Sequence, residues 1–189
     1  MQALKRLRRY NKVIFTRNPL DRLLSAWKDK LYDTNHFYAE RVGSQIIAQY
    51  RPNATDQEIQ RGTPVMLGEF LQYIDEFPMP TRFFDPHWKP IHENCFPCAI
   101  NYTYVGKLET LIDDVGYVAR KATGLESVPP IMASRAPMPL EQDMRYQELR
   151  KLPRQLVERV LAKYKIDYEM FGYDMQRDLE NVYSIPSSK

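Results

Sequence analysis

The sequence has 189 residues, of which 43% are hydrophobic. This is enough for one domain with a buried core, and the chain is too short for us to expect two. No stretch approaches the roughly 18 consecutive apolar residues of a membrane-spanning helix, and no signal-peptide core follows Met1, which excludes a membrane span within these residues. The net charge of +3 is uneven, because residues 1–30 hold nine Lys or Arg against two Asp. Such a segment is typical of a solvated basic helix or of a surface for nucleic acid or acidic polysaccharide; we favour the helix and expect no nucleic-acid partner.

Residues 13–27 predict a short strand that leads into a helix. Val13–Thr16 is β-branched and aromatic, as strands prefer. Asn18 can cap a helix, and Pro19 suits its first position. Apolar residues then recur at spacings of three, four and seven, which predicts one buried stripe: Leu20, Leu23, Leu24, Trp27 and Leu31.

The opposite face of this helix has the character of an anion site. Asn18 and Ser25 are about two turns apart, so they face the same way. Arg17 lies at the positive end of the helix, and the planar fork of arginine suits phosphate oxygens. We therefore predict that Arg17, Asn18, Arg22 and Ser25 bind a phosphate group. The alternative is that Arg17 pairs with a helix carboxylate and that Ser25 lies on a solvated face.

The remaining pattern predicts an α/β domain with a mainly parallel sheet flanked by helices. We expect an irregular, helix-containing insertion over 33–62, a core helix from Thr63 to Phe77, an aromatic loop over 81–98, a strand over 99–105 and a helix over 109–123. A proline-rich loop over 127–139 and short helices over 142–150 and 153–164 follow. Residues 175–189 show no apolar period, so we predict a domain over 1–174 and a mobile tail over 175–189.

Several motifs occur in an order that resembles one enzyme family. Arg17, Pro19, Arg22 and Ser25 fit the frame R-x-P-x-x-R-x-x-S, which resembles the 3′-phosphate-binding motif of sulfotransferases. The further motifs are His87-Trp88-Lys89-Pro90, Cys95-Phe96-Pro97-Cys98, Tyr104–Leu111 and Asp167–Tyr173. Together they resemble the Golgi carbohydrate sulfotransferases of the chondroitin, dermatan and HNK-1 type.

This resemblance implies a P-loop-like sulfotransferase domain that uses 3′-phosphoadenosine 5′-phosphosulfate as sulfate donor and needs no metal. It implies a glycan acceptor such as chondroitin or dermatan, at the 4-O position of N-acetylgalactosamine. It also implies a Golgi location and a membrane anchor that these residues do not contain. The first strand and the lysine-bearing 5′-phosphosulfate loop of the family should come many tens of residues before Val13, whereas twelve residues precede it. We therefore expect an N-terminally shortened form in which that loop is missing and activity is reduced.

His87 is the candidate general base, because imidazole titrates near neutral pH. The alternative is a packed structural histidine beside Trp88. Sulfuryl transfer also needs positive charge around the transferred group, which makes Lys107 a second catalytic candidate beside Lys89.

Cys95 and Cys98 follow His87 and His92 in a spacing, H-x4-H-x2-C-x2-C, that invites a zinc interpretation. This is not a usual zinc-finger pattern. The resemblance implies a lumenal protein, in which we rank a disulfide above zinc. The disulfide would join Cys95 to Cys98, or join either of them to a cysteine of an N-terminal part that these residues do not include.

Asn53-Ala54-Thr55 fits the N-glycosylation pattern. We prefer it to Asn101-Tyr102-Thr103, which falls in the predicted strand.

Three functions stay open from the sequence. The first is a sulfate-transferring enzyme. The second is a non-catalytic module that binds nucleotide and glycan, and the third is a small zinc-stabilised interaction domain.

Overall fold

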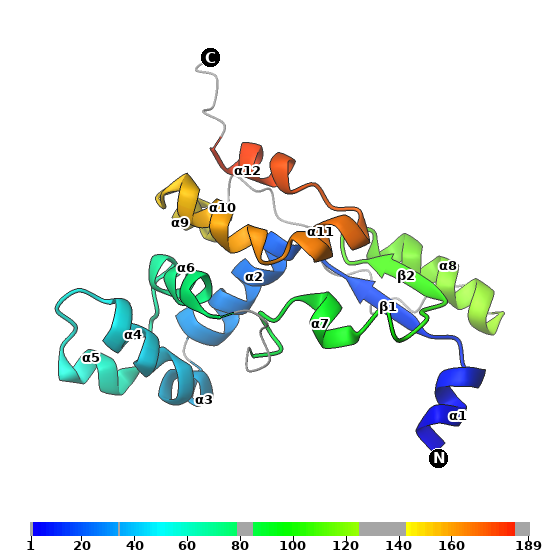
Figure 1. The fold of residues 1–189 in the computed structure, drawn as a ribbon. Coiled ribbons are helices and arrows are strands. Elements are labelled where there is room, and N and C mark those ends of the chain that lie inside the picture. Colours follow the sequence, from blue (N-terminus) through cyan, green and yellow to red (C-terminus); the bar gives the residue numbers. More distant parts are fainter. Residues whose placement is uncertain (1, 34, 79–84, 125–142, 184–189) are drawn as a thin grey trace. The chain divides into compact units, whose positions relative to one another are not determined.

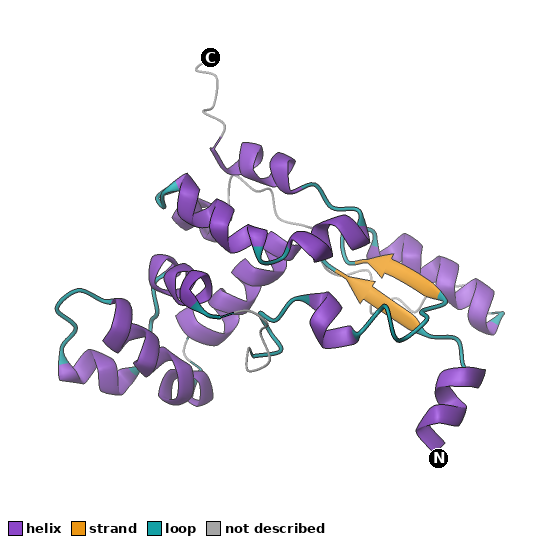
Figure 2. Ribbon diagram, in the orientation of Figure 1, coloured by secondary structure: helices purple, strands orange, loops and turns teal. Residues whose placement is uncertain are grey.

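The computed structural model describes residues 2–33, 35–78, 85–124 and 143–183, which are mostly helical with one small sheet (Figures 1 and 2). The chain divides into two compact units. The first contains residues 1–18 and 91–138, and the second contains residues 19–90 and 139–189. The predicted proline-rich loop over 127–139 lies outside the described residues.

The first unit is built around two parallel strands. Its elements are α1 (Gln2–Arg9), β1 (Val13–Thr16), α7 (Ile91–Cys95), β2 (Tyr104–Lys107) and α8 (Leu111–Thr123). The strands β1 and β2 run parallel and side by side (Figure 2). Val13 lies opposite Tyr104, and Thr16 lies opposite Lys107. The predicted α/β class with a parallel sheet is confirmed, and β1 occupies the predicted residues.

The second strand begins later than the sequence predicts. Residues 99 and 100 belong to a turn, because the amide groups of Ala99 and Ile100 both donate to the carbonyl of Phe96. Phe96 has a positive φ of 49°, so the backbone reverses there and reaches β1 only at Tyr104. Position 106 within this strand requires a glycine, because a Cβ atom there would come within 2.5 Å of the Phe15 ring.

The second unit is helical. Its elements are α2 (Pro19–Trp27), η1 (Lys28–Tyr32), α3 (His36–Tyr38), η2 (Ala39–Gly43), α4 (Ser44–Tyr50), α5 (Asp56–Arg61), α6 (Leu67–Glu76), α9 (Met144–Arg150), α10 (Arg154–Ala162), α11 (Lys165–Phe171) and α12 (Met175–Tyr183). Here η marks single π-helical turns. The insertion predicted over 33–62 is thus a series of short helices, and the core helix begins at Leu67 rather than Thr63.

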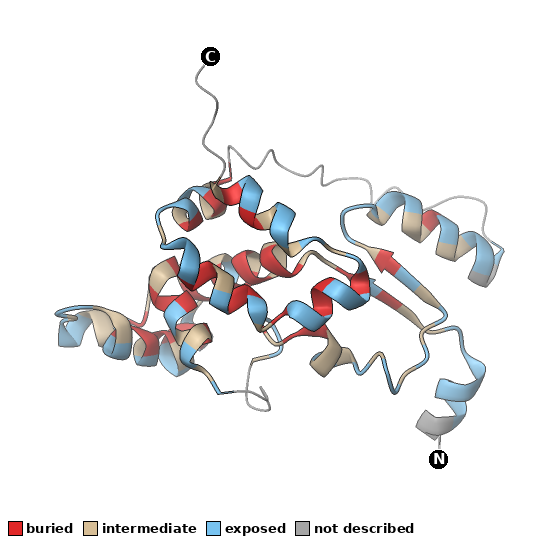
Figure 3. Cartoon of the chain, turned by 45° about the horizontal axis from the view of Figure 1, so that its top comes forward, coloured by how far each residue is buried: buried red, intermediate tan, exposed pale blue. Residues whose placement is uncertain are grey.

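The core of the second unit forms around α2 (Figure 3). The predicted stripe is confirmed, since Leu20, Leu23, Leu24, Trp27 and Leu31 are all at most 1% exposed. The Trp27 indole N–H donates to the carbonyl of Val65 at 2.9 Å, which satisfies its one polar group inside the core. Trp88, also fully buried, packs edge-on against Phe70 with ring centroids 5.5 Å apart.

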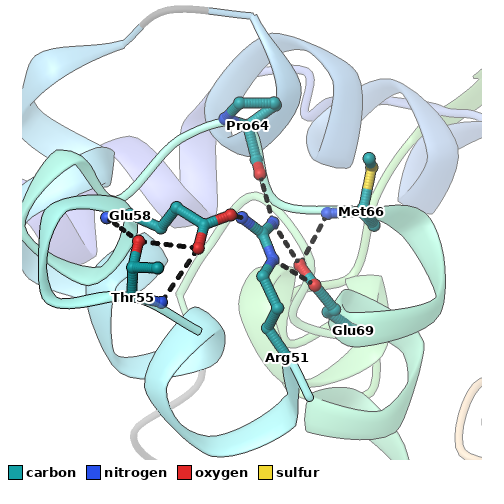
Figure 4. Close-up of polar contacts among 6 residues, drawn as sticks. All are labelled: Arg51, Thr55, Glu58, Pro64, Met66 and Glu69. Atoms are coloured by element: carbon teal, nitrogen blue, oxygen red, sulfur yellow. Dashed lines mark hydrogen bonds and ion pairs between the residues drawn. The ribbon is translucent and has the colours of Figure 1, made fainter. Parts of the chain in front are cut away.

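One arginine fixes the short helices of the insertion to α6 (Figure 4). Arg51 donates to both carboxylate oxygens of Glu69, at 2.7 and 2.9 Å, and to the carbonyl of Pro64 at 2.7 Å. A fourth contact, 3.3 Å long, reaches Glu58 on α5. The capping residue Thr55 accepts the backbone N–H of Glu58, so α4, α5 and α6 share one polar network.

The mobile tail predicted over 175–189 is wrong for its first nine residues. Residues 175–183 form helix α12, in which Leu179 and Val182 are 2% and 1% exposed. Residues 184–189 lie outside the described part of the chain.

Candidate functional site

The candidate residues fall in both units, and each is described within its own unit. Arg17 and Asn18 belong to the first unit, at the end of β1. The carbonyl of Thr16 accepts the amide of Leu108 at 2.8 Å, and the carboxylate of Glu109 accepts the amide of Asn18 at 2.7 Å. Among the described residues, the half-buried Arg17 side chain has no hydrogen-bond or ion-pair partner.

Ser25 lies on α2 in the second unit and contacts an arginine that the sequence did not bring forward. Its Oγ accepts a hydrogen bond from Arg145 Nη1, on α9. Arg145 is held by Asp143, whose two carboxylate oxygens each lie 2.9 Å from Nε. Asp21 lies 4.0 Å from Arg145 Nη2 and accepts the hydroxyl of Tyr146 at 3.1 Å. The hydrogen bonds to Asp143 raise the pKa of Arg145, so it stays charged.

This contact determines how Ser25 meets a ligand. A hydroxyl has one proton to donate and two lone pairs to accept with. Since Arg145 already supplies a donor to Ser25 Oγ, the serine proton is directed elsewhere. The hydroxyl is therefore prepared to donate to an anion, and donation strengthens when the same oxygen accepts a charged donor.

Arg22 points its guanidinium at backbone carbonyls. Nη1 donates to the carbonyl of Lys89 at 2.6 Å, and Nη2 donates to that of Pro86 at 2.7 Å. These bonds connect α2 to the turn that contains the motif His87-Trp88-Lys89-Pro90.

Hydrogen bonds within the turn, and one from Tyr164, hold its backbone in place. Its own amides, of Trp88 and Lys89, donate to the carbonyl of Asp85 at 3.1 and 2.8 Å. The hydroxyl of Tyr164 donates to the carbonyl of Trp88 at 2.7 Å. Because the Trp88 ring is buried in the core, the turn is anchored by both backbone and side chain.

His87 is the exposed side chain of this anchored turn. The imidazole is 45% exposed, and its ring packs edge-on against Tyr38, whereas the Trp88 ring is fully buried. His87 Nδ1 lies 2.7 Å from an Asp85 carboxylate oxygen. A carboxylate at this nitrogen favours the tautomer with the proton on Nδ1, which leaves the lone pair on Nε2.

Tyr38 completes the polar surroundings of His87. Its hydroxyl lies 2.9 Å from Nδ1 and donates to the other Asp85 oxygen at 3.2 Å. Burial and the nearby charge of Asp85 raise the pKa of Tyr38 to about 12, so the phenol keeps its proton at neutral pH. The group Tyr38, Asp85 and His87 can thus hold an imidazole as a proton acceptor.

Lys107 lies at the end of β2 in the first unit. Its backbone N–H donates to the Asp114 carboxylate at 2.7 Å, and the Thr110 hydroxyl donates to the same oxygen at 2.7 Å. These bonds hold the pKa of Asp114 below its usual range. Asp114 and Tyr117 also line a cavity of about 270 Å³ beside β2.

The cysteine and glycosylation candidates are accessible to different degrees. Cys95 is half-buried and Cys98 exposed, and both thiols are free in this structure. The described residues contain no group of three or more potential metal ligands. Asn53 is exposed in a turn with a positive φ of 55°. Asn101 precedes β2 and is also exposed, so the expected reason for ranking it lower does not hold.

A search of the described helices for membrane spans finds none of sufficient length and apolar character.

Comparison with known proteins agrees with the motifs. A family-wide sequence profile described as the sulfotransferase family matches residues 1–174. Human carbohydrate sulfotransferase 9 is 41% identical over 112 residues, which cover 59% of this chain and 25% of the relative. Carbohydrate sulfotransferase 11 of Rattus norvegicus is 33% identical over 181 residues, or 93% of this chain and 50% of the relative. Carbohydrate sulfotransferase 14 of Danio rerio is 33% identical over 172 residues, or 90% and 46%.

The chain thus spans between a quarter and a half of the length of these relatives. No solved structure matches it significantly. Since the family profile covers nearly the whole sequence, and since the relatives share a carbohydrate sulfotransferase name, the chain belongs to the sulfotransferase family.

Proposed function

We propose that this chain contains the acceptor-activating site of a carbohydrate sulfotransferase, which transfers sulfate from 3′-phosphoadenosine 5′-phosphosulfate to a glycan hydroxyl. The observation that carries the proposal is the pair Asp85 and His87, 2.7 Å apart, on a turn anchored to the core. The donor supplies the sulfuryl group and a phosphate that can leave with the electron pair of the broken S–O bond.

His87 has the role of general base in this proposal. Its Nε2 accepts the proton of the acceptor hydroxyl while that oxygen forms a bond to sulfur. Asp85 stabilises the imidazolium that results, as a carboxylate does at the other ring nitrogen. Because the imidazole is nearly half exposed, a large substrate such as a sugar chain can reach it.

The 3′-phosphate of the donor is assigned to residues of the sequence frame. Ser25 supplies a hydroxyl whose proton is free to donate, and α2, nine residues long, presents its positive N-terminal end. Arg17 supplies a guanidinium with no partner among the described residues, and Asn18 adds polar groups beside it. These groups fit a phosphate in charge and hydrogen bonding. Lys107 remains a weaker candidate for charge near the transferred group.

The acceptor proposed from the resemblance is chondroitin or dermatan, at the 4-O position of N-acetylgalactosamine. The exposed cations of the N-terminal segment, Lys5, Arg6, Arg8 and Arg9, suit such an acidic polymer. From the same resemblance we propose a Golgi location, with proteoglycans as acceptors. Cys95 and Cys98 would then be disulfide candidates, and Asn53 a glycosylation candidate.

A non-catalytic module that binds nucleotide and glycan is the second candidate. It would use Arg17 and Ser25 for the nucleotide and the exposed N-terminal cations for the glycan, without His87 acting as a base.

Transfer of labelled sulfate to desulfated chondroitin and dermatan tests the proposal. We expect His87→Gln to lower kcat by about 10²- to 10⁴-fold with little change in donor affinity, because proton abstraction contributes that range. The matched control is His36→Gln, since His36 is exposed at the start of α3. Full activity of His87→Gln would contradict the base assignment. Nucleotide binding with no transfer by the wild-type chain would favour the second candidate.

A further inference from the structure

Arg22 stands in the R-x-P-x-x-R-x-x-S motif, which the sequence predicts to bind phosphate, yet its guanidinium donates to backbone carbonyls. Each terminal nitrogen of its guanidinium donates to a carbonyl of the turn 85–89, at 2.6 and 2.7 Å. A charged donor makes such bonds stronger than a neutral one does. The side chain is half-buried on α2, and the bond to Lys89 is partly shielded from water, whereas the bond to Pro86 is exposed.

The two carbonyls lie on either side of His87 in the chain. Pro86 precedes it and Lys89 follows it by two residues. The amides of the turn are already satisfied by the carbonyl of Asp85, and the carbonyl of Trp88 by Tyr164. Arg22 adds charged donors to the carbonyls of Pro86 and Lys89, and it thereby fixes the backbone from which the imidazole projects.

The orientation of the imidazole depends on this backbone. Asp85 belongs to the same turn, accepts both the amide and the Nδ1 proton of His87, and also accepts the hydroxyl of Tyr38. If the turn moves relative to α3, the contacts of the Tyr38 hydroxyl with Asp85 and with His87 Nδ1 change. The surroundings that keep the proton on Nδ1 and the lone pair on Nε2 are then altered.

Arg22 could bind a phosphate only if both of its hydrogen bonds to the turn were broken. Moving the guanidinium to a ligand would break both hydrogen bonds, and bonds made by a charged donor are costly to lose. Ser25 and Arg17 differ in this respect. Ser25 has a proton to donate, and Arg17 has no partner within the described chain.

We propose that Arg22 is a positioning residue for His87 and not a ligand of the 3′-phosphate. It connects the helix that carries Ser25 to the turn that carries the base. This inference rests on the proposed function for the role of His87, while the placement of the imidazole is a property of the protein alone.

Two measurements on the full chain separate these roles. The first is the ¹⁵N and ¹³C NMR spectrum of the imidazole groups over a pH titration, which is tractable because the chain has three histidines. The second is the ratio of affinities for adenosine 3′,5′-bisphosphate and adenosine 5′-monophosphate, which isolates the 3′-phosphate.

We expect Arg22→Gln to change the tautomer signature and titration of His87 and to alter the affinity ratio less than twofold. Ser25→Ala should do the reverse, with a ratio reduced about tenfold and His87 signals unchanged. Arg22→Lys keeps one charged donor and should give an intermediate His87 spectrum; it also serves if Arg22→Gln does not fold. The control Arg154→Gln removes an exposed arginine paired with Glu158, and it should change neither measurement.

An Arg22→Gln or Arg22→Lys protein with unchanged His87 signals would overturn the inference. A fall in the affinity ratio as large as that of Ser25→Ala would overturn it as well. If the wild-type chain shows no preference for the 3′-phosphate, the proposed function fails, while the NMR measurement still judges the role of Arg22.

Discussion

Three arginines of this chain have side chains in different electrostatic situations, which a sequence motif does not distinguish. Arg17 has no partner within the described chain, and Arg22 is bound to two carbonyls. Arg145 is bound to a carboxylate that is 4% exposed. An arginine whose charge is already neutralised adds little attraction for a phosphate. Arg145 is therefore better suited to orient Ser25 than to bind an anion itself.

The role of Arg145 can be tested through its pairing with Asp143. We expect Arg145→Leu alone to lower the free energy of unfolding by about 3 to 5 kcal/mol, because it leaves a buried carboxylate without its cation. The double variant Asp143→Asn with Arg145→Leu removes that charge and should recover most of the loss. In both variants the ratio of affinities for adenosine 3′,5′-bisphosphate and adenosine 5′-monophosphate should be about 5- to 10-fold smaller than in wild type, because the donor to Ser25 is gone.

Denaturant unfolding and calorimetry with the two nucleotides provide these values. Arg150→Leu is the control on the same helix, because Arg150 donates to the carbonyl of Val182 and does not contact Ser25. A double variant that is stable and keeps the full preference for the 3′-phosphate would show that Ser25 acts without Arg145.

At the scale of elements, the sequence predicted well what neighbouring residues determine. The strand at Val13–Thr16 and the buried stripe of α2 follow from local propensity and periodicity, and both are confirmed. The start of β2 was missed because Phe96 adopts a positive φ, which aromatic residues seldom do. Helix α12 was missed although Met175, Leu179 and Val182 recur at helical spacing, because the pattern covers only two turns.

The site depends on contacts that sequence spacing cannot predict. Ser25 and Arg145 are 120 residues apart, and Tyr38 and His87 are 49 apart. The sequence identified Ser25 and His87 through their motifs, but their partners belong to no recognisable pattern. Asp85, two residues before His87, was the nearest available signal, since a carboxylate at this spacing can accept from the imidazole.

Helix α12 provides a test at this scale. Leu179 is 2% exposed and belongs to the core of the second unit. We expect Leu179→Ala to lower the free energy of unfolding by about 2 to 4 kcal/mol, because it removes buried methyl groups and leaves a cavity. The control Met170→Ala, at a side chain that is 40% exposed, should change it by less than about 0.5 kcal/mol. Equal effects in urea unfolding would mean that α12 does not pack as described.

For the whole molecule, the central question is how much of the chemistry these 189 residues can perform. The proposed base and the residues assigned to the 3′-phosphate lie within them, whereas the relatives are about twice as long. Transfer also builds negative charge on the phosphate oxygen that leaves sulfur. Stabilising that charge requires preorganised donors at the 5′ side of the donor. Lys89 and Lys107 are cations of this chain, but neither lies in a loop of backbone donors of that kind.

We therefore expect the chain to bind adenosine 3′,5′-bisphosphate but to transfer sulfate slowly. The comparison is with a longer version that carries a lysine-bearing 5′-phosphosulfate loop ahead of β1. Removing one preorganised donor of this type costs about 10²- to 10³-fold in rate, so the longer version should be faster by at least that factor. Labelled donor with desulfated chondroitin measures both turnover numbers, and the His87→Gln variant of the longer version checks that the same base is used. Comparable turnover by the two versions would show that Lys12, Lys89 or Lys107 meets the leaving charge, and that the chemistry lies within these residues.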